Sequence, residues 1–195
     1  NVFRYELRSW SYILEDTPRE LSKSPFPDWI ESGHLRISKT PVSDLEQDLI
    51  EACYKWNVHA VAFDPAQAQA TSETLQSNGI TAGRMQQSHY MFHEPITDMM
   101  ASLKAGRLRF DGNPVLKWAA GNAFLVQDRK QKVMLDKQQS KDKIDAIVSA
   151  TMAYRMAMIA PTMQVNMTMS DGPKEEPKTD TERAVEIYTR GIFDD

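Results

Sequence analysis

Apolar residues recur at every second position over the opening of the chain, where Tyr5 and Leu7 lie between charged neighbours. A period of two is that of a strand with one buried face, so a long opening strand is predicted over the first fifteen residues. The nearly continuous apolar run from Val58 to Phe63 indicates a central strand covered on both faces. That run stops at Asp64-Pro65, which places Asp64 at the carboxyl end of a buried strand.

Helical spacing dominates two longer stretches. Ser43 is expected to cap a helix over 43–56, with acidic residues in its first turn and apolar residues on one side. Ser140 is expected to cap a long final helix over 140–159. The following residues are rich in charge, proline and small polar side chains, which predicts a flexible linker over 161–181.

The remaining elements follow from the same periodicities and from the proline and glycine residues at their ends. They are a short helical piece from Trp29 to Gly33, strands over 34–38, 80–85 and 107–110, helices over 66–77, 94–104 and 115–122, and a hairpin of 124–127 and 132–135. Strands and helices alternate, so the prediction is an α/β domain with a mixed sheet flanked by helices.

Composition and charge narrow the class of protein. The chain has 195 residues, 41% of them apolar, which is enough for one sizeable core. The net charge of −4 comes from residues 161–195, which hold eight acids and four bases, so the rest of the chain is neutral and argues neither for nor against nucleic acid. Cys53 is expected to be buried as a small hydrophobic residue. With no long apolar run, a soluble intracellular domain is expected.

Asp64 is the first candidate for chemistry. Ligand sites in open α/β sheets lie at the carboxyl ends of strands, where Asp64 is expected. An Asp directly before a Pro that starts a helix is also an ordinary N-cap, and spacing alone favours this second interpretation.

Asp145 is the second candidate, in the first turns of the final helix at the edge of an apolar stripe, where it is expected to be half-buried. Asp142 lies three residues earlier on the same face, and for it a helix-start acid favoured by the helix dipole is the simpler interpretation. Two carboxylates on different elements could bind Mg²⁺ or Mn²⁺, which prefer oxygen ligands. Two such ions can activate a water and stabilise the leaving oxygen of a phosphodiester.

Other motifs offer no competing site. The four histidines, His34, His59, His89 and His93, lack the spacing of zinc ligands, and Pro95 disfavours a continuous helix through the last two. The sequence contains no Gly-x-x-x-x-Gly-Lys-Ser/Thr loop, so no P-loop for ATP is expected.

Several blocks of sequence follow one another in a characteristic order and at a characteristic spacing. They are Pro27–Leu35, Ala60-Val61-Ala62-Phe63-Asp64, Gly106–Leu116, Leu135-Asp136-Lys137 followed by Lys143-Ile144-Asp145-Ala146-Ile147-Val148, and the late Tyr188-Thr189-Arg190-Gly191-Ile192. Together they resemble the C-terminal nuclease domain of the large subunits of tailed-phage terminases, the motors that cut and package double-stranded DNA.

The resemblance implies a ribonuclease H-like fold in which acids gather around two divalent metal ions, Mg²⁺ or Mn²⁺. By position, Asp64 matches the acid that closes the central strand and Asp145 the acid on the final helix, so both are expected to be catalytic metal ligands. Asp142 and Lys137 lie close to these motifs and are carried over only as candidates for contacts around the metal ions or with a phosphate. The implied reaction is metal-assisted hydrolysis, with neither a covalent intermediate nor a required histidine.

The resemblance also implies a domain organisation. Residues 1–160 are expected to form the nuclease domain and residues 161–195 a flexible acidic tail. The family's first metal-binding Asp lies on a strand that precedes the one opening this chain, and the ATPase half has no counterpart here, so the domain is expected to be N-terminally incomplete. A missing ligand lowers metal affinity, so weak or no activity of the isolated chain is expected.

The leading functional expectation is an endodeoxyribonuclease domain of a phage or prophage packaging motor in the host cytoplasm, which cuts concatemeric double-stranded DNA when packaging starts and ends. The resemblance implies double-stranded DNA, the terminase small subunit and the portal protein as partners of the full-length protein, with no membrane. The alternative is a catalytically silent module that docks DNA or the portal. It predicts no cleavage even in the complete protein.

Overall fold

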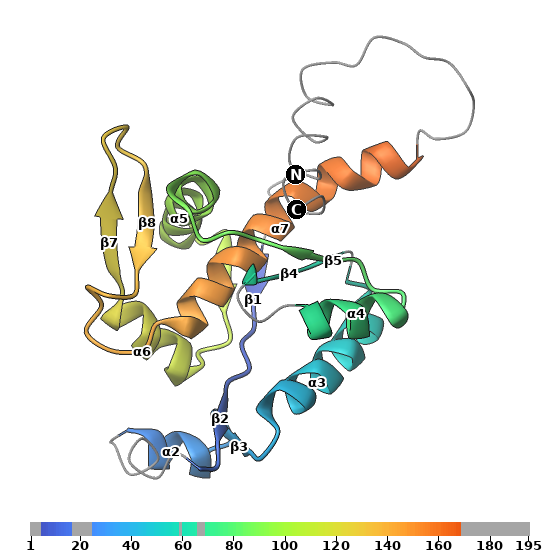
Figure 1. Ribbon diagram of the computed structural model, residues 1–195. Coiled ribbons are helices and arrows are strands. Elements are labelled where there is room, and N and C mark those ends of the chain that lie inside the picture. Colours follow the sequence, from blue (N-terminus) through green and yellow to red (C-terminus); the bar gives the residue numbers. More distant parts are fainter. Residues whose placement is uncertain (1–4, 17–24, 59, 66–68, 169–195) are drawn as a thin grey trace.

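The computed structural model describes residues 5–16, 25–58, 60–65 and 69–168, and over these ranges helices and strands alternate (Figure 1). The strands are β1 (Tyr5–Leu7), β2 (Tyr12–Leu14), β3 (Arg36–Ser38), β4 (Val61–Phe63), β5 (Ala82–Arg84), β6 (Leu108–Phe110), β7 (Phe124–Gln127) and β8 (Val133–Asp136). The helices are α2 (Phe26–Glu31), α3 (Pro41–Trp56), α4 (Gln69–Ser77), α5 (His89–Lys104), α6 (Pro114–Asn122) and α7 (Asp145–Thr168). The predicted α/β class is confirmed.

The described strands pair in twos. β1 pairs with β6, β2 with β3 and β4 with β5, each in parallel, whereas β7 and β8 form the predicted antiparallel hairpin. The predicted long opening strand is wrong in its length, because β1 and β2 belong to different pairs. Between them, the backbone of Ser9 is held by the loop after β6. Its N–H donates to the Asp111 carboxylate (3.2 Å), and its carbonyl accepts from the Asn113 side-chain amide (3.0 Å).

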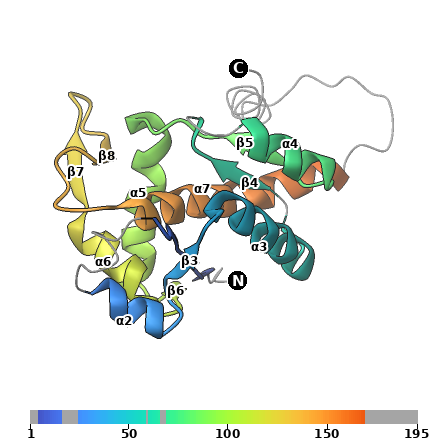
Figure 2. The same cartoon turned by 60° about the horizontal axis from the view of Figure 1, so that its bottom comes forward.

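Helix α7 runs through the middle of the molecule in both views (Figures 1 and 2). One face of it forms the largest core cluster together with α5 and β8. The buried members are Met85, Phe92, Ile96, Leu135, Ile144, Val148, Met152 and Met156. Ala60 and Ala62, from β4 and the residue before it, pack against this cluster. The central strand therefore rests on the final helix.

The other face of β4 is covered as well. Val61 and Phe63 pack against a second cluster, which includes Cys53 of α3 and Leu75 of α4. The prediction that this strand is covered on both faces is thus confirmed, as is the burial of Cys53, which raises the pKa of its thiol. Within the described residues β4 pairs with β5 alone.

Two of the predicted helix caps are wrong. Helix α3 starts at Pro41, with Thr40 at the N-cap, because proline suits the first helical position and lacks only an N–H that would have no partner there. Ser140 lies before α7 instead of capping it, since its hydroxyl donates to the Asp136 carbonyl and accepts from the Phe124 amide (3.1 Å). The serine thereby closes the base of the hairpin.

Two prolines lie inside helices where a break was predicted. Helix α5 begins at His89, capped by Ser88, and contains Pro95, so His89 and His93 lie one turn apart on one helix. Helix α7 continues past Pro161 to Thr168, so the linker prediction is wrong for 161–168, while 169–181 lies outside the described residues. A proline removes one backbone hydrogen bond, and helix-forming neighbours can compensate for that loss. No helix among the described residues is both long enough and apolar enough to cross a membrane.

Candidate functional site

Asp64 follows β4 directly, at the carboxyl end of the strand, and is partly buried. The side-chain amide of Gln87 donates to its Oδ2. Gln87 comes shortly after β5, so the contact joins the carboxyl ends of two parallel neighbours, where α/β folds place ligand sites. Helix α4 begins at Gln69, and residues 66–68, where a cap by Asp64 would act, lie outside the described residues.

Asp145 is the first residue of α7, and its side chain is 70% exposed. The prediction of a half-buried carboxylate is wrong, because Ile144 and Val148 take the core-facing positions of this turn. The Lys137 ammonium lies 3.0 Å from Asp145 Oδ1. Two of the residues proposed from sequence are thus in direct contact, and Asp145 also benefits from the positive end of the helix dipole.

Asp136, just before Lys137, organises the turn that carries the lysine. Its Oδ1 accepts from the backbone amides of Gln138 (2.7 Å) and Gln139 (3.1 Å), and its Oδ2 accepts from the Gln139 side chain (2.9 Å). The hydrogen bonds from Gln139 are the main reason why the pKa of Asp136 lies below its usual range. Sequence analysis assigned no role to Asp136, although an Asp at the end of a strand, before polar residues, is typical of a turn in which the side chain binds the backbone.

Asp142 lies in the loop before α7, where its Oδ1 accepts from the backbone amide of Lys143 (2.9 Å). This contact fits the local, helix-start interpretation that the sequence favoured. His93 also has a structural contact, since its Nδ1 accepts from the backbone amide of Val133 on the hairpin (3.2 Å).

The packing of α7 on β4 brings together the two elements that carry Asp64 and Asp145. Their carboxylates are hard oxygen donors, which suit Mg²⁺ or Mn²⁺ in kind. Within the described residues, no group of three or more His, Cys, Asp or Glu side chains is arranged to hold a metal ion.

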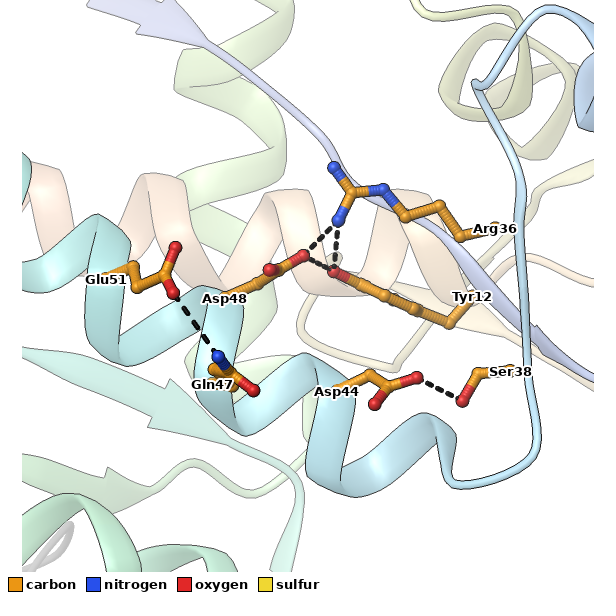
Figure 3. Close-up of polar contacts among 7 residues, drawn as sticks. All are labelled: Tyr12, Arg36, Ser38, Asp44, Gln47, Asp48 and Glu51. Atoms are coloured by element: carbon orange, nitrogen blue, oxygen red, sulfur yellow. Dashed lines mark hydrogen bonds and ion pairs between the residues drawn. The ribbon is translucent and has the colours of Figure 1, made fainter.

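A second polar cluster holds α3 against β2 and β3 (Figure 3). The Tyr12 hydroxyl and the Arg36 guanidinium both donate to the Asp48 carboxylate, and Arg36 also lies 3.3 Å from the Tyr12 oxygen. Burial, followed by the hydrogen bond and charge of Asp48, raises the pKa of Tyr12 to about 12. The hydroxyl and the charges of this cluster are paired with one another. The cluster therefore attaches α3 to β2 and β3.

One turn of α3 away, Ser38 donates to Asp44 in the same way (Figure 3). The sequence contained a signal for these contacts. Two acids lie four residues apart on the predicted helix, and two polar residues lie two positions apart on the preceding strand, so each pair shares one face of its element. These contacts were not predicted, because the acids of this helix were interpreted only as residues of its first turn.

Comparison with known proteins supplies the family context. The family model described as "Terminase large subunit, endonuclease domain" matches residues 14–160. Protein YmfN of Escherichia coli K12 is 26% identical over 153 residues, which cover 76% of this chain and 34% of that protein. The large terminase subunit of Enterobacteria phage HK97 is 26% identical over 140 residues, which cover 69% of this chain and 28% of that protein.

The fold is similar to that in the crystal structure of the HK97 bacteriophage large terminase, with a TM-score of 0.65 at 23% identity. The match covers 74% of this chain and 32% of that one. The ribonuclease H-like α/β fold expected from the sequence is thereby confirmed. This chain spans about a third of the length of the proteins that it matches.

Proposed function

Because the chain belongs to the terminase large subunit endonuclease-domain family, we propose that it hydrolyses phosphodiester bonds of double-stranded DNA with the help of Mg²⁺ or Mn²⁺ ions. The observation that carries the proposal is the packing of β4, the strand directly before Asp64, on α7, the helix that begins with Asp145. When bound, the metal ions would supply an activated water and stabilise the leaving oxygen.

The residues of this chain have distinct proposed tasks. Asp64 and Asp145 would hold the metal ions, and Gln87 would orient the Asp64 carboxylate through its side-chain amide. Lys137, which pairs with Asp145, would contact a phosphate of the DNA. Asp142, close to the start of α7, is a candidate for a contact around the metal ions or with a phosphate.

Within the described residues, β4 is paired along one edge only. Ala60 to Phe63 are apolar and covered by helices on both faces, yet all four remain partly exposed, and the strand pairs only with β5. An additional strand along the other edge would complete their burial. An acid at its end, beside Asp64, would complete the metal-binding set, so we propose that full activity requires such a strand from a longer polypeptide.

For the longer polypeptide we propose cutting of concatemeric DNA in the host cytoplasm at the start and end of packaging, with the terminase small subunit and the portal protein as partners. A second candidate function is a catalytically silent docking module for DNA or the portal. It differs from the endonuclease in predicting no cleavage even by the complete protein.

The decisive experiment incubates supercoiled plasmid and Mn²⁺ with this chain and with a version extended upstream by one strand. We expect cutting by the extended form and weak or no cutting by the shorter one. Asp64→Ala and Asp145→Ala should each abolish cutting, whereas Asp28→Ala, which removes an acid on α2, should not. Undiminished cutting by either of the first two variants would overturn the mechanism, and an inactive extended form would favour the docking module.

A further inference from the structure

Trp10 and Trp56 form an exposed aromatic pair away from the carboxylates. Their ring centroids lie 5.6 Å apart, with the planes inclined by 35°, and the residues are 46% and 43% exposed. The other two tryptophans of the chain, Trp29 and Trp118, contact each other and Phe26 in a separate core cluster. Large aromatic side chains gathered in water mark binding surfaces more often than stability elements.

Two cations lie over the Trp56 ring of this pair. The Arg8 guanidinium carbon lies 5.7 Å from the centroid of the Trp56 ring, and the Lys55 ammonium nitrogen lies 5.0 Å from it. Arg8 is also paired with Glu6 (2.6 Å), and both of these side chains are more than half exposed. Ion pairs in water are weak, so Arg8 can exchange the Glu6 carboxylate for another anion at little cost.

The combination of exposed indoles and flanking cations suits a strand of unpaired nucleotides. Proteins that bind single strands stack the bases on aromatic rings and contact the phosphates with Lys and Arg. A protein partner is the main competing occupant, because tryptophan and arginine are enriched at protein interfaces, although lysine is depleted there. A duplex fits less well, since its bases are stacked on one another and not available to a tryptophan ring.

We propose that Trp10, Trp56, Arg8 and Lys55 form a binding surface for single-stranded DNA, with a base stacked on the exposed indole pair and phosphates beside the two cations. The presence of DNA at this protein rests on the proposed function, but the surface uses neither Asp64 nor Asp145. Trp56 ends α3 and precedes β4, whereas Asp64 follows β4. The two places therefore use different residues and can be tested separately.

The test is a titration of tryptophan fluorescence with a short oligothymidylate in the absence of metal ions. We expect quenching on binding, and about tenfold weaker affinity for Trp10→Leu and for Trp56→Leu. Phe124→Leu removes an aromatic side chain that is equally exposed, on the hairpin, and should leave the affinity unchanged. Circular dichroism of each variant establishes that it is folded, so a loss of binding is attributable to the surface.

Charge variants give a second signature that general damage would not produce. Arg8→Gln should weaken binding and reduce its dependence on salt by about one phosphate contact. Glu6→Gln releases Arg8 from its ion pair and should strengthen binding a few-fold. A Glu6→Gln variant that binds no more tightly than the unaltered protein would contradict the role given to Arg8.

Competing occupants are outcomes of the same titration. Equal quenching by a blunt duplex or by polyglutamate would overturn the proposal, because the surface would then recognise negative charge and not unpaired bases. Unchanged binding by both tryptophan variants would also overturn it. Asp64→Ala and Asp145→Ala should bind the oligonucleotide normally, so a failure of cleavage and a failure of this surface are distinguishable.

Discussion

The Lys137 ammonium lies 3.0 Å from the Asp145 carboxylate and thereby links the turn after the β7–β8 hairpin to the first residue of α7. Both side chains are about half exposed or more. The pair therefore contributes more to the arrangement of charge at the candidate site than to the stability of the fold.

Lys137→Ala should lower the free energy of unfolding by no more than about 1 kcal/mol, because water and salt screen an exposed pair. Urea denaturation of the variant, with Lys117→Ala as an exposed-lysine control on α6, measures the difference. The small effect should vanish in concentrated salt. A loss well above that limit would show that Lys137 has a buried role that its exposure does not suggest.

Alkaline pH should destabilise the protein through two tyrosines. Burial, followed by hydrogen bonds to Asp48 and Asp98, raises the pKa of Tyr12 and of Tyr154 to about 12, above the value of 10.0 of a free tyrosine. The stability that these groups contribute is complete below pH 10 and is lost as the pH rises towards 12, because the unfolded chain releases its protons first.

The measurement for these tyrosines is the free energy of unfolding as a function of pH. At the lower end of this pH window, Tyr154→Phe should have a smaller free energy of unfolding than the unaltered protein, since the hydroxyl that it removes is hydrogen-bonded to Asp98 (2.6 Å) and Ser102 (3.0 Å). As the pH rises through the window, the free energy of unfolding of the variant should decrease less steeply. An identical slope for the variant and the unaltered protein would contradict the raised pKa.

Phe92 and Phe124 make a matched pair for testing the core. Phe92 is 1% exposed in the cluster between α5 and α7, whereas Phe124 is 46% exposed on β7. Phe92→Ala should cost about 3–5 kcal/mol through lost burial and a cavity. Phe124→Ala should change stability by no more than about 0.5 kcal/mol. Thermal or urea denaturation compares them, and similar losses at the two positions would contradict the assigned core.

Asn113 is a buried N-cap whose side chain makes one further contact. Its Oδ1 accepts from the Val115 amide (2.9 Å) at the start of α6, and its Nδ2 donates to the Ser9 carbonyl (3.0 Å). Asn113→Ala should therefore destabilise the protein by about 1–2 kcal/mol. Asn113→Asp keeps the cap acceptor and loses the donor, so its loss should be smaller if the cap dominates. If both variants lose the same amount, the link to Ser9 is the more important contact.

The sequence predicted the elements that have a strong local signal. A strand directly before Asp64 and the hairpin over 124–135 are present, because burial on both faces and a charged turn leave clear patterns, although the strand covers only Val61–Phe63 of the predicted 58–63. The split between β1 and β2 was not predictable, since it depends on contacts of Ser9 with residues more than a hundred positions away. Pairing over such distances leaves no trace in a local window.

The candidate site shows the same division. Positions at element ends identified Asp64 and Asp145, but exposure of Asp145 depends on how α7 rotates about its axis when Ile144 and Val148 enter the core. The helix boundaries predicted at Pro95 and Pro161 are wrong, because the general rule that proline breaks a helix does not take account of how the surrounding helix packs. The contact between Lys137 and Asp145 needed the turn held by Asp136, which only the folded chain forms.

The edge of β4 that has no strand beside it within the described residues also affects the expected solubility of this protein. An apolar strand with backbone groups available for pairing is a template for association between molecules. We therefore expect copies of the chain to aggregate through this edge at high protein concentration. A companion segment that covers it should keep the domain dispersed, so solubility offers a screen for such a segment that requires no assay of cleavage.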